Sequence, residues 1–554
     1  MELKSDRKSN QQWWRSAVIY QVYPRSFFDT NGDGIGDLQG IIKKLDYIAS
    51  LGVDAVWISP FYQSPMKDFG YDISDYRAVD PIFGTIEDFK ELIVAAKERN
   101  LKILIDQVWN HTSEEHPWFK ESRQSRNNPK ADWYVWEDAK EDGTPPNNWR
   151  STFGGSAWTW DEVRQQYYLH NFLIEQPDLN WYNPEVKKAI FDVAKFWLDL
   201  GVDGFRLDVV NFFFYDPSLK DNPCRPEDTP LPDGAGANDP FFSQLNLHNL
   251  SQPQVLPLLE DIRELMDNYP DTTTLAEISS TEDGLLTASE YVSGNKRLHM
   301  AYNSSLMNDE PLTYARMRRL IARVEELFAD GVICWTAGTH DFPRLKSRWH
   351  KYQIDDQFIN EAFDHMFAAL IIALRGSCCL YQGDELGLTQ ANIPFEKMQD
   401  PFGIAGYPSI LGRDGSRTPM PWLKEDYNAG FSTAKEPWLP IPEEHLRYAV
   451  DTQEPNPNSL LHKYRRLIHW RKQQPALLWG DLTLLDTPKP LLGFTRECPE
   501  QNMICLFNLD TLPVRFDLSP YPSCVDGDEV DFNNRRYENI IEISGYGVFL
   551  GCYQ

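Results

Sequence analysis

The sequence has few cysteines, no long hydrophobic run and fewer basic than acidic residues. Eight cysteines among 554 residues form no metal-binding pattern, and the adjacent Cys378 and Cys379 lie in an apolar stretch that predicts core packing rather than a disulfide. The most apolar run, Met366 to Leu374, is too short to cross a bilayer. A net charge of −28 disfavours nucleic acid and anionic membranes as partners.

The first ten residues do not resemble a signal peptide. Residues 1–10 contain no apolar segment of the kind found in signal peptides, so we expect a cytoplasmic protein. Apolar residues make up 42% and charged residues 25%, which is typical of a soluble globular chain. We expect no organic cofactor, and either a monomer or a weak homodimer.

Short runs of β-branched and aromatic residues alternate with longer amphipathic stretches along most of the chain. The eight predicted strands are 17–23, 55–59, 102–107, 203–208, 273–277, 298–302, 332–336 and 377–381. Helical spacing of apolar residues occurs at 38–51, 86–99, 184–200 and 359–375. This alternation predicts an α/β protein with a parallel sheet, and eight such units can close into a (β/α)8 TIM barrel. An open doubly wound sheet is the alternative.

Two regions interrupt or follow this pattern. Between the third and fourth predicted strands, residues 111–177 are rich in Trp, Asn, Gly and Pro, which predicts an irregular insertion domain (domain B) over the mouth of the barrel. The barrel itself is then expected to comprise residues 1–110 and 178–468. From residue 469 to 554, short alternating runs predict an all-β C-terminal domain, a β-sandwich.

Polar residues cluster where the predicted strands end. These residues are Asp68, Tyr71, Asp106, His111, Arg206, Asp208, Glu277, His340 and Asp341. In a (β/α)8 barrel the carboxyl ends of the strands carry the active site, so these side chains are expected to meet at one rim. A single Asp at a strand end often caps the next helix, but several carboxylates with two His and an Arg are typical of acid/base chemistry.

Several segments, in order along the chain, resemble glycoside hydrolase family 13, the α-amylase superfamily, and within it the exo-acting α-glucosidase and oligo-1,6-glucosidase branch. Besides Glu277 and the pair His340-Asp341, the matching segments are AVIYQVYPRSF at 17–27, DQVWNH at 106–111, QPDLN at 176–180, GFRLD at 204–208, YQGDELG at 381–387 and GRDGSRTPMPW at 412–422. The resemblance covers nearly the whole chain.

The resemblance implies roles for individual residues. Asp208 would be the nucleophile, Glu277 the general acid/base, and Asp341 the residue that stabilises the transition state. The residues expected to bind the substrate are Asp68, Tyr71, His111, Phe153, Phe172, Arg206, Val209, His340 and Arg413. Phe153 and Phe172 would lie beside the glucose ring and the aglycone, although packing within the insertion explains such aromatics equally well.

Three positions bear on how the family pattern applies here. The residue before the His of the last motif is usually Asn but is Thr339 here, and the residue before the acid/base is usually Gly but is Ala276 here; both changes could shift the pocket slightly. In this branch Val after the nucleophile accompanies cleavage of α-1,6 bonds, and Thr accompanies restriction to α-1,4 bonds. Val209 therefore indicates α-1,6 activity, or it is simply a favourable residue at the end of a strand.

A second motif, DTNGDGIGD at 29–37, carries oxygen side chains at short spacing. The candidate metal ligands are Asp29, Asn31, Asp33, the carbonyl of Ile35, and Asp37. The loop is not an EF-hand, because its twelfth position is Gly40 rather than Glu. Such a sequence can also form a turn without metal. Related glucosidases carry this loop with a bound ion, so we expect a structural Ca²⁺, with Mg²⁺ as the alternative.

The resulting expectation is a retaining exo-α-glucosidase that acts on short oligosaccharides or small glucosides. It would hydrolyse α-1,6 bonds as well as or instead of α-1,4 bonds, with transglucosylation as a side reaction. A sucrose isomerase or a dedicated transglucosidase is the alternative enzyme. A catalytically inactive glucosidase-like binding protein is disfavoured, because all three catalytic carboxylates are present.

Overall fold

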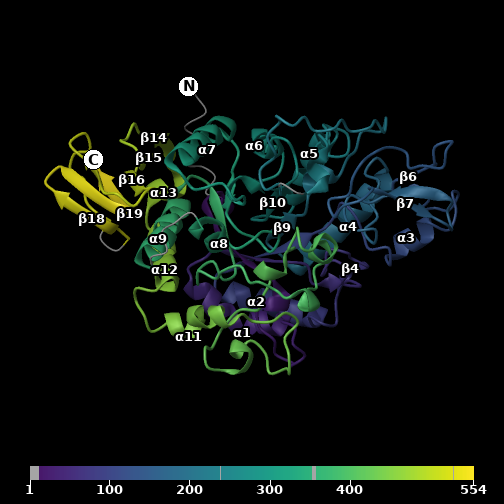
Figure 1. Cartoon of the computed structure of the whole chain (residues 1–554), viewed down its shortest axis with the longest axis horizontal. Helices are drawn as coiled ribbons and strands as arrows, with labels where there is room; N and C mark the ends of the chain where they lie inside the picture. The colour runs from purple at the N-terminus through teal and green to yellow at the C-terminus, as the bar shows by residue number, and fades with distance from the viewer. Residues whose placement is uncertain (1–11, 237–238, 352–356, 528–529) are drawn as a thin grey trace.

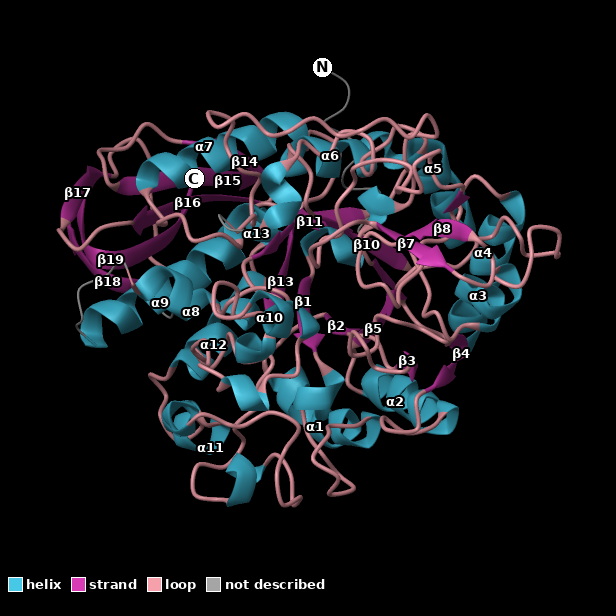
Figure 2. Ribbon diagram, turned by 45° about the vertical axis from the view of Figure 1, so that its right-hand side comes forward, coloured by secondary structure: helices cyan, strands magenta, loops and turns pink. Residues whose placement is uncertain are grey.

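The computed structural model describes residues 12–236, 239–351, 357–527 and 530–554. Its centre is one sheet of eight parallel strands, which Figure 2 shows surrounding the middle of the molecule. The strands are β1 (Val18–Val22), β2 (Ala55–Ile58), β5 (Lys102–Gln107), β9 (Gly204–Leu207), β10 (Thr273–Ile278), β11 (Met300–Asn303), β12 (Cys334–Thr336) and β13 (Ser377–Tyr381). Neighbours pair in the order β11-β10-β9-β5-β2-β1-β13-β12, and a bridge from Ala301 to Ile333 joins the two ends into a nearly closed barrel. The predicted barrel is confirmed.

Helices pack around the outside of this barrel. They are α1 (Leu38–Ser50), α2 (Ile86–Glu98), α4 (Pro184–Leu200), α5 (Val255–Asp267), α6 (Gly284–Tyr291), α7 (Tyr314–Leu327), α8 (Leu345–His350) and α9 (Gln357–Ala373). Local sequence sets their ends: the Asp37 carboxylate accepts the Gly40 N–H at the start of α1, and Gly201, with φ +98°, ends α4. The four predicted helical stretches coincide with α1, α2, α4 and α9.

The side chains of the barrel strands alternate between two cores. Ile19, Trp57 and Cys379 pack inside the barrel, whereas Val18 and Cys378 pack between the barrel and its helices. The adjacent cysteines therefore point to opposite faces and both are free thiols, as the sequence predicted.

The insertion after β5 is small but ordered. It contains α3 (Pro117–Ser122) and an antiparallel sheet of β6 (Trp136–Glu137), β7 (Trp158–Asp161) and β8 (Gln166–Leu169). A short pair, β3 (Tyr62–Gln63) and β4 (Asp75–Val79), precedes it. Bridges from His111 to Asp178 and from Tyr134 to Leu179 join the beginning of the insertion to its end, which fixes it to the barrel rim.

The end of the chain forms a separate antiparallel sheet, at the yellow end of Figure 1. After α10 (Pro401–Gly406), α11 (Val450–Gln453), α12 (Leu460–Arg471) and α13 (Pro475–Trp479), its strands are β14 (Asp481–Leu484), β15 (Leu491–Cys498), β16 (Gln501–Asn508), β17 (Val514–Asp517), β18 (Phe532–Tyr537) and β19 (Ile540–Tyr553). Their hydrogen bonds join all six strands into one sheet, so the finer description as a β-sandwich stays a prediction, as do the residue limits of the three domains.

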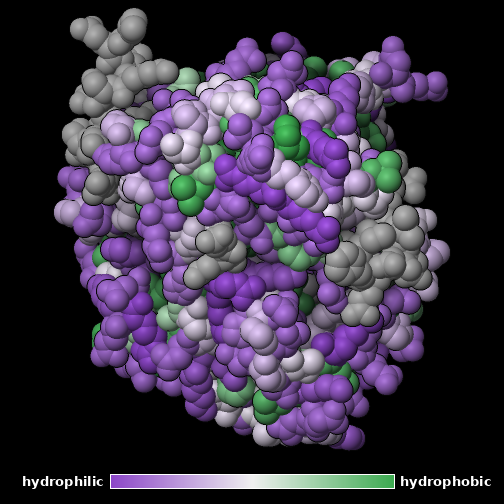
Figure 3. Space-filling view, turned by 90° about the vertical axis from the view of Figure 1, so that its left-hand side faces the viewer, coloured by the Kyte–Doolittle hydropathy of each residue, from purple (hydrophilic) through white to green (hydrophobic). Residues whose placement is uncertain are grey.

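One face of the molecule is largely polar (Figure 3). Figure 3 shows hydrophilic residues over most of one face, with hydrophobic residues scattered singly. Within the described residues, no helix combines the length and the apolar character needed to span a membrane.

Candidate active site

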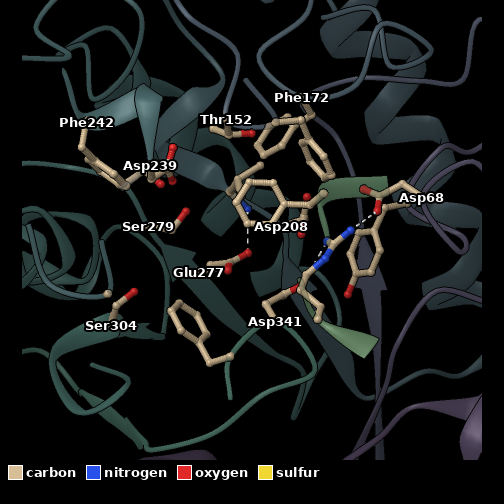
Figure 4. Close-up of a pocket in the computed structure, with 18 of the residues that line it drawn as sticks. Asp68, Thr152, Phe172, Asp208, Asp239, Phe242, Glu277, Ser279, Ser304 and Asp341 are labelled. Atoms are coloured by element: carbon tan, nitrogen blue, oxygen red, sulfur yellow. Dashed lines mark hydrogen bonds and ion pairs between the residues drawn. The ribbon is translucent and has the colours of Figure 1, made fainter. Parts of the chain in front are cut away.

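A cavity of about 220 Å³ opens at the carboxyl ends of the barrel strands (Figure 4). The predicted site residues that line it are Asp68, Tyr71, His111, Phe153, Phe172, Asp208, Val209, Glu277, Asp341 and Arg413. Arg206 and His340 are fully buried next to the residues that line the cavity. The structure thus brings together all the residues that the strand ends and the family resemblance indicated, from segments spread over most of the chain.

The Arg206 guanidinium organises the carboxylates at the centre of the cavity. Its Nη1 donates to Oδ1 of Asp208 at 2.6 Å and to Oδ1 of Asp106 at 2.7 Å. Its Nη2 donates to Glu277 and, at 2.8 Å, to the hydroxyl of Tyr302. Because Arg206 is two residues before Asp208, which directly follows β9, extended backbone places both side chains on the same face. One buried cation therefore holds Asp208 and Glu277 side by side.

The backbone turns sharply directly after Asp208. Val209 has φ +37° and ψ +50°, a left-handed conformation that costs a β-branched residue roughly 1–3 kcal/mol. Packing against Phe212 and Phe242 holds it there, and the turn directs its N–H at Oε2 of Glu277, 3.2 Å away. Glu277 therefore accepts hydrogen bonds from Arg206 and from this backbone amide.

Burial dominates the electrostatics of these carboxyl groups. It raises the pKa of Asp208 and of Glu277, and the Arg206 guanidinium only partly opposes this. The neighbouring charge of Glu277, followed by those of Asp106 and Asp341, raises the pKa of Asp208 further. Several carboxylates around one guanidinium cannot all be ionised without unbalanced buried charge, so the cluster retains a proton towards neutral pH.

Asp341 lies in a different environment. Burial would raise its pKa, but the guanidinium groups of Arg417 and Arg413 lower it below the usual value. Nη2 of Arg417 is 3.0 Å from its Oδ1, and Nη1 of Arg413 is 3.4 Å away. The backbone N–H of Asp341 donates to Oγ1 of Thr339 at 3.2 Å, so the residue that departs from the family pattern contacts a predicted catalytic residue. Asp341 is ionised in this setting.

Ala276, the second residue that differs from the family pattern, does not line the cavity. It is fully buried in the core between the barrel and its helices, on the opposite face of β10 from Glu277. The methyl group that replaces the usual glycine hydrogen is therefore accommodated in apolar packing.

An ion pair closes one end of the cavity. Nη2 of Arg413 donates to Asp68 at 2.7 Å and to Asp400 at 2.7 Å. The side chain of Gln176 donates to the other oxygen of Asp68 at 3.1 Å. In Figure 4 Asp68 lies on the opposite side of Asp208 and Glu277 from Asp239 and Ser304. The cavity is thus bounded by charged, hydrogen-bonded groups at the Asp68 end.

The two histidines at this end are held in fixed positions. The His340 ring stacks on Tyr71 with 5.2 Å between ring centroids, and its Nδ1 lies 2.8 Å from the Gln21 amide. Nε2 of His111 lies 3.1 Å from the carbonyl oxygen of Tyr71. Burial lowers the pKa of His111 to about 3 and that of His340 well below the usual value. Both rings are therefore neutral near pH 7 and can take part in hydrogen bonds without adding charge.

Aromatic rings from the insertion line the same cavity. Phe153 contacts Phe172 edge-on at 6.4 Å and Phe402 of α10 at 5.6 Å, and the Arg413 guanidinium lies over the Phe153 ring at 5.1 Å. Phe172 also packs against His111 at 5.1 Å. Their position fits the expected contact with a sugar, and their mutual packing fits the alternative equally.

Some residues of the site were not among the predicted site residues. Asp400, Arg417, Gln176 and Tyr302 support the predicted residues, and Gln176 and Arg417 lie inside segments that the family resemblance had already marked. The additional residues that line the cavity are Thr152, Asp233, Gly234, Asp239, Phe242, Ser279, Ser280, Ser304, Phe342 and Phe402. Most of these lie in loops without periodic pattern, where sequence offers no signal.

The loop before α1 uses its carboxylates internally. The predicted ligands Asp29, Asn31, Asp33, Ile35 and Asp37 all lie in this loop. Asp29 accepts N–H groups of Asn31 at 3.0 Å and of Gly34 at 2.8 Å, and Asp37 accepts that of Gly40 at 2.6 Å. In the part of the chain that the structure describes, no three His, Cys, Asp or Glu side chains converge as a metal site requires. The oxygen atoms of this loop suit a hard cation, but a cation would compete with these backbone N–H groups for the carboxylates. The metal therefore stays a prediction.

The barrel and the carboxylates at its rim define the class of the protein as a glycoside hydrolase. Residues 21–480 match the family model described as alpha amylase, catalytic domain, and the chain belongs to this family. It is 49% identical over 500 residues to a probable alpha-glucosidase of Rhizobium meliloti (strain 1021), covering 90% of each chain. It is 38% identical over 534 residues to an oligo-1,6-glucosidase of Parageobacillus thermoglucosidasius, again covering 90% of each. The solved structure of an alpha-glucosyl transfer enzyme superposes with a TM-score of 0.93 at 49% identity, covering 98% of this chain and 100% of that one.

Proposed function

We propose that the protein is a retaining exo-α-glucosidase that removes terminal α-linked glucose from short oligosaccharides. The observation that carries this proposal is the Arg206 guanidinium, which holds Asp208 and Glu277 together at the centre of a cavity. Retaining glycosidases use two carboxyl groups about 5–5.5 Å apart, one as nucleophile and one as acid/base. Relatives named alpha-glucosidase and oligo-1,6-glucosidase support the same substrate class.

The two carboxyl groups take different roles. Burial raises the pKa of both groups; in this proposal Glu277 carries the proton that the cluster retains, and Asp208, ionised and hydrogen-bonded to Arg206, attacks the anomeric carbon and forms a glucosyl-enzyme ester. Glu277 donates its proton to the leaving oxygen, and after this step its carboxylate removes a proton from the water that hydrolyses the ester. The charge of Asp341, ionised beside Arg417, stabilises the positive charge that develops on the sugar ring.

The closed end of the cavity supports exo action. Asp68 and Arg413 present charged groups that can hold hydroxyls of a terminal glucose, and in this proposal their ion pair blocks a longer chain at that end. Tyr71 and His111 line the same end and would contact this glucosyl unit. Long polymers bound internally are therefore expected to be poor substrates.

The proposed linkage specificity includes α-1,6 bonds. Val209 lines the cavity directly after Asp208 and offers no hydroxyl there. The identity to an oligo-1,6-glucosidase over most of the chain supports this assignment. A panel of maltose, isomaltose, sucrose, trehalose and maltotriose, with analysis of product linkages, tests the proposal. We expect glucose release from isomaltose as well as from maltose; release from maltose alone contradicts the α-1,6 part.

A dedicated transglucosidase is the second candidate. The solved structure that superposes with a TM-score of 0.93 is that of an alpha-glucosyl transfer enzyme, which favours this candidate. A sugar hydroxyl and water attack the same glucosyl-enzyme, so the geometry of the catalytic residues is common to both reactions. From maltose or isomaltose each transfer releases one glucose and forms one trisaccharide, whereas each hydrolysis releases two glucose molecules. A ratio of glucose to trisaccharide near one at low substrate concentration would support the transferase, and the same panel would reveal a sucrose isomerase by its products.

Several finer points remain proposals. A structural Ca²⁺ in the loop 29–37 rests on its oxygen donors, and the residues named above would hold it there away from the reacting carboxylates. A cytoplasmic location and a monomer or weak homodimer rest on the sequence alone.

A further inference from the structure

The end of the cavity farthest from Asp68 is built by loops that follow four barrel strands. Figure 4 shows Asp239, Phe242, Ser279 and Ser304 on this side of Glu277. The residues that form this end are Asp233, Gly234, Asp239, Phe242, Ser279, Ser280, Ser304 and Phe342. Because the glucosyl unit is proposed to fill the closed end, the aglycone must lie here, and this placement of the aglycone rests on the proposed function.

Two carboxylates and, among the residues that the structure describes, no cationic side chain line this end of the cavity. Asp233 and Asp239 both line the cavity, whereas Arg413 is the single cationic residue among the described lining residues and lies at the closed end. Two arginines lie behind the lining residues. Arg225 binds Glu282 through two hydrogen bonds of 3.0 and 2.6 Å, whereas Arg316 contacts Glu310 at 3.3 Å and also attracts Asp233 electrostatically without lining the cavity. Residues 237 and 238 are Ala and Asn, so the sequence adds no charge there.

The fold holds the two carboxylates in place. The carboxylate of Asp233 accepts hydrogen bonds from the hydroxyl of Ser305 at 2.9 Å and from the side-chain amide of Asn308 at 3.2 Å. The next residue, Gly234, has φ +81°, and a Cβ there would lie 2.6 Å from Cβ of Ser304, so only glycine lets the loop press against the end of β11. Both anchors fix Asp233 at the rim.

Asp239 is held by a helix terminus. Its carboxylate accepts the N–H of Phe241 at 2.9 Å and so caps a short helical turn at Pro240–Ser243. Asp233 and Asp239 are thus built into the rim and do not swing freely in solvent.

We infer that the aglycone end of this cavity accepts neutral, hydroxyl-bearing groups and rejects anionic ones, with Asp233 and Asp239 as the specificity-determining residues. A carboxylate or phosphate ester placed here meets two negative charges held at the rim, one on the partly buried Asp239 and one on the exposed Asp233, and is repelled by both at short range. The hydroxyls of Ser279 and Ser304, by contrast, both donate and accept hydrogen bonds and match the hydroxyls of a sugar.

The test compares two phenyl α-glucosides that differ in one para substituent, a carboxamide and a carboxylate. The measured quantity is the ratio of kcat/KM for the neutral compound to kcat/KM for the anion. At low salt we expect this ratio to be about tenfold larger in the wild type than in the double variant Asp233→Asn/Asp239→Asn. Comparing this ratio between proteins cancels the different leaving-group strengths. Asn can still cap the turn at 239, so that substitution keeps its structural role. Added NaCl should narrow the ratio in the wild type, because salt screens exposed charges.

Asp221→Asn is the matched control. Asp221 is exposed on the same long loop but does not line the cavity, so its removal changes the net charge in the same direction and should leave the ratio at its wild-type value. The single variants at 233 and 239 should give intermediate ratios. An unchanged ratio in the double variant, or the same change in Asp221→Asn, overturns the inference while hydrolysis of the neutral glucoside upholds the proposed function. No hydrolysis of the neutral glucoside overturns both.

Discussion

A single buried arginine links the residues on which the chemistry depends. Arg206, Asp208 and Glu277 could be predicted from sequence, because strand periodicity places them at the ends of adjacent parallel strands. The contact between Asp68 and Arg413 could be inferred only through the family resemblance, since 345 positions separate them. Asp233 and Asp239 could not be predicted, because their loop has no periodicity and reaches the cavity only through tertiary packing.

The assigned roles predict the behaviour of two near-isosteric variants. Asp208→Asn removes the nucleophile and Glu277→Gln removes the transferable proton, so each should lose more than about 99% of turnover on disaccharides. Neither change removes volume from the core, so thermal denaturation should show a folded protein in both cases. Steady-state hydrolysis of isomaltose measures the loss. A variant that folds and retains more than a few per cent of activity contradicts the assignment.

The pH dependence of activity follows from burial of Glu277. Burial raises its pKa, and the acid/base must be protonated to donate, so this requirement is met below the raised pKa and is lost as pH rises through it, while the need for an ionised Asp208 sets the acid limb. We expect the alkaline limb of kcat/KM for a disaccharide well above the usual titration range of a glutamate. In Glu277→Gln, assayed with an aryl glucoside whose leaving group needs no proton, this limb should disappear. The same limb in the variant would assign it to another group.

At the scale of elements, strand and helix positions were predicted well where apolar spacing is regular. All eight barrel strands overlap their predicted ranges, and α4 matches its prediction at both ends because Asn183 and Gly201 cap it. The three short strands of the insertion were not predicted. Its sequence lacks alternation because Trp149 and Trp158 form a small aromatic core of their own, and tertiary contacts determine the pairing.

Arg496 connects the C-terminal sheet to the barrel. It is fully buried on β15, and burial lowers its pKa to about 9, yet it donates to carbonyl oxygens: those of Ala373 at the end of α9, Leu477 and Gly480. Arg496→Met would leave these carbonyls buried without this donor. We expect a loss of stability of about 3 kcal/mol, visible as a melting temperature several degrees lower, with hydrolysis by the folded protein retained.

Arg515→Met is the control for this variant. Arg515 lies in the same sheet, is 72% exposed and pairs with Glu542 at 2.8 Å. Its loss should leave the melting temperature close to the wild-type value, because an exposed ion pair contributes little to stability. Equal melting temperatures for the two variants would show that Arg496 does not hold the sheet to the barrel.

The loop 29–37 predicts a response to chelation. If Ca²⁺ binds there, EDTA should lower the melting temperature before it affects hydrolysis at room temperature, because the loop contributes none of the residues that line the cavity. Asp29→Asn should abolish the response, and restored Ca²⁺ should reverse it in the wild type. An unchanged melting temperature in EDTA would favour the alternative turn, which the amide contacts of Asp29 already satisfy.

At the scale of the whole molecule, the cavity is assembled from parts that are distant in the chain. The insertion supplies Phe153 and Phe172, the barrel supplies the carboxylates, and the segment after β13 supplies Phe402 and Arg413. In Figures 1 and 2 the C-terminal sheet lies at one end of the molecule, away from the insertion at the other end. None of its described residues is among those that line the cavity. The order of the structural regions along the chain could be predicted from sequence. The way the cavity is closed could not, because it depends on packing between residues that are far apart in the chain.

The stereochemistry of the first product tests the central claim most directly. Nucleophilic attack by Asp208, followed by water activated by Glu277, inverts the anomeric carbon twice and so releases α-glucose. Proton NMR of the hydrolysis of an α-glucoside, recorded before mutarotation, distinguishes the two anomers. We predict that α-glucose appears first and β-glucose only later by mutarotation. Initial release of β-glucose would show a single displacement and contradict the covalent role of Asp208.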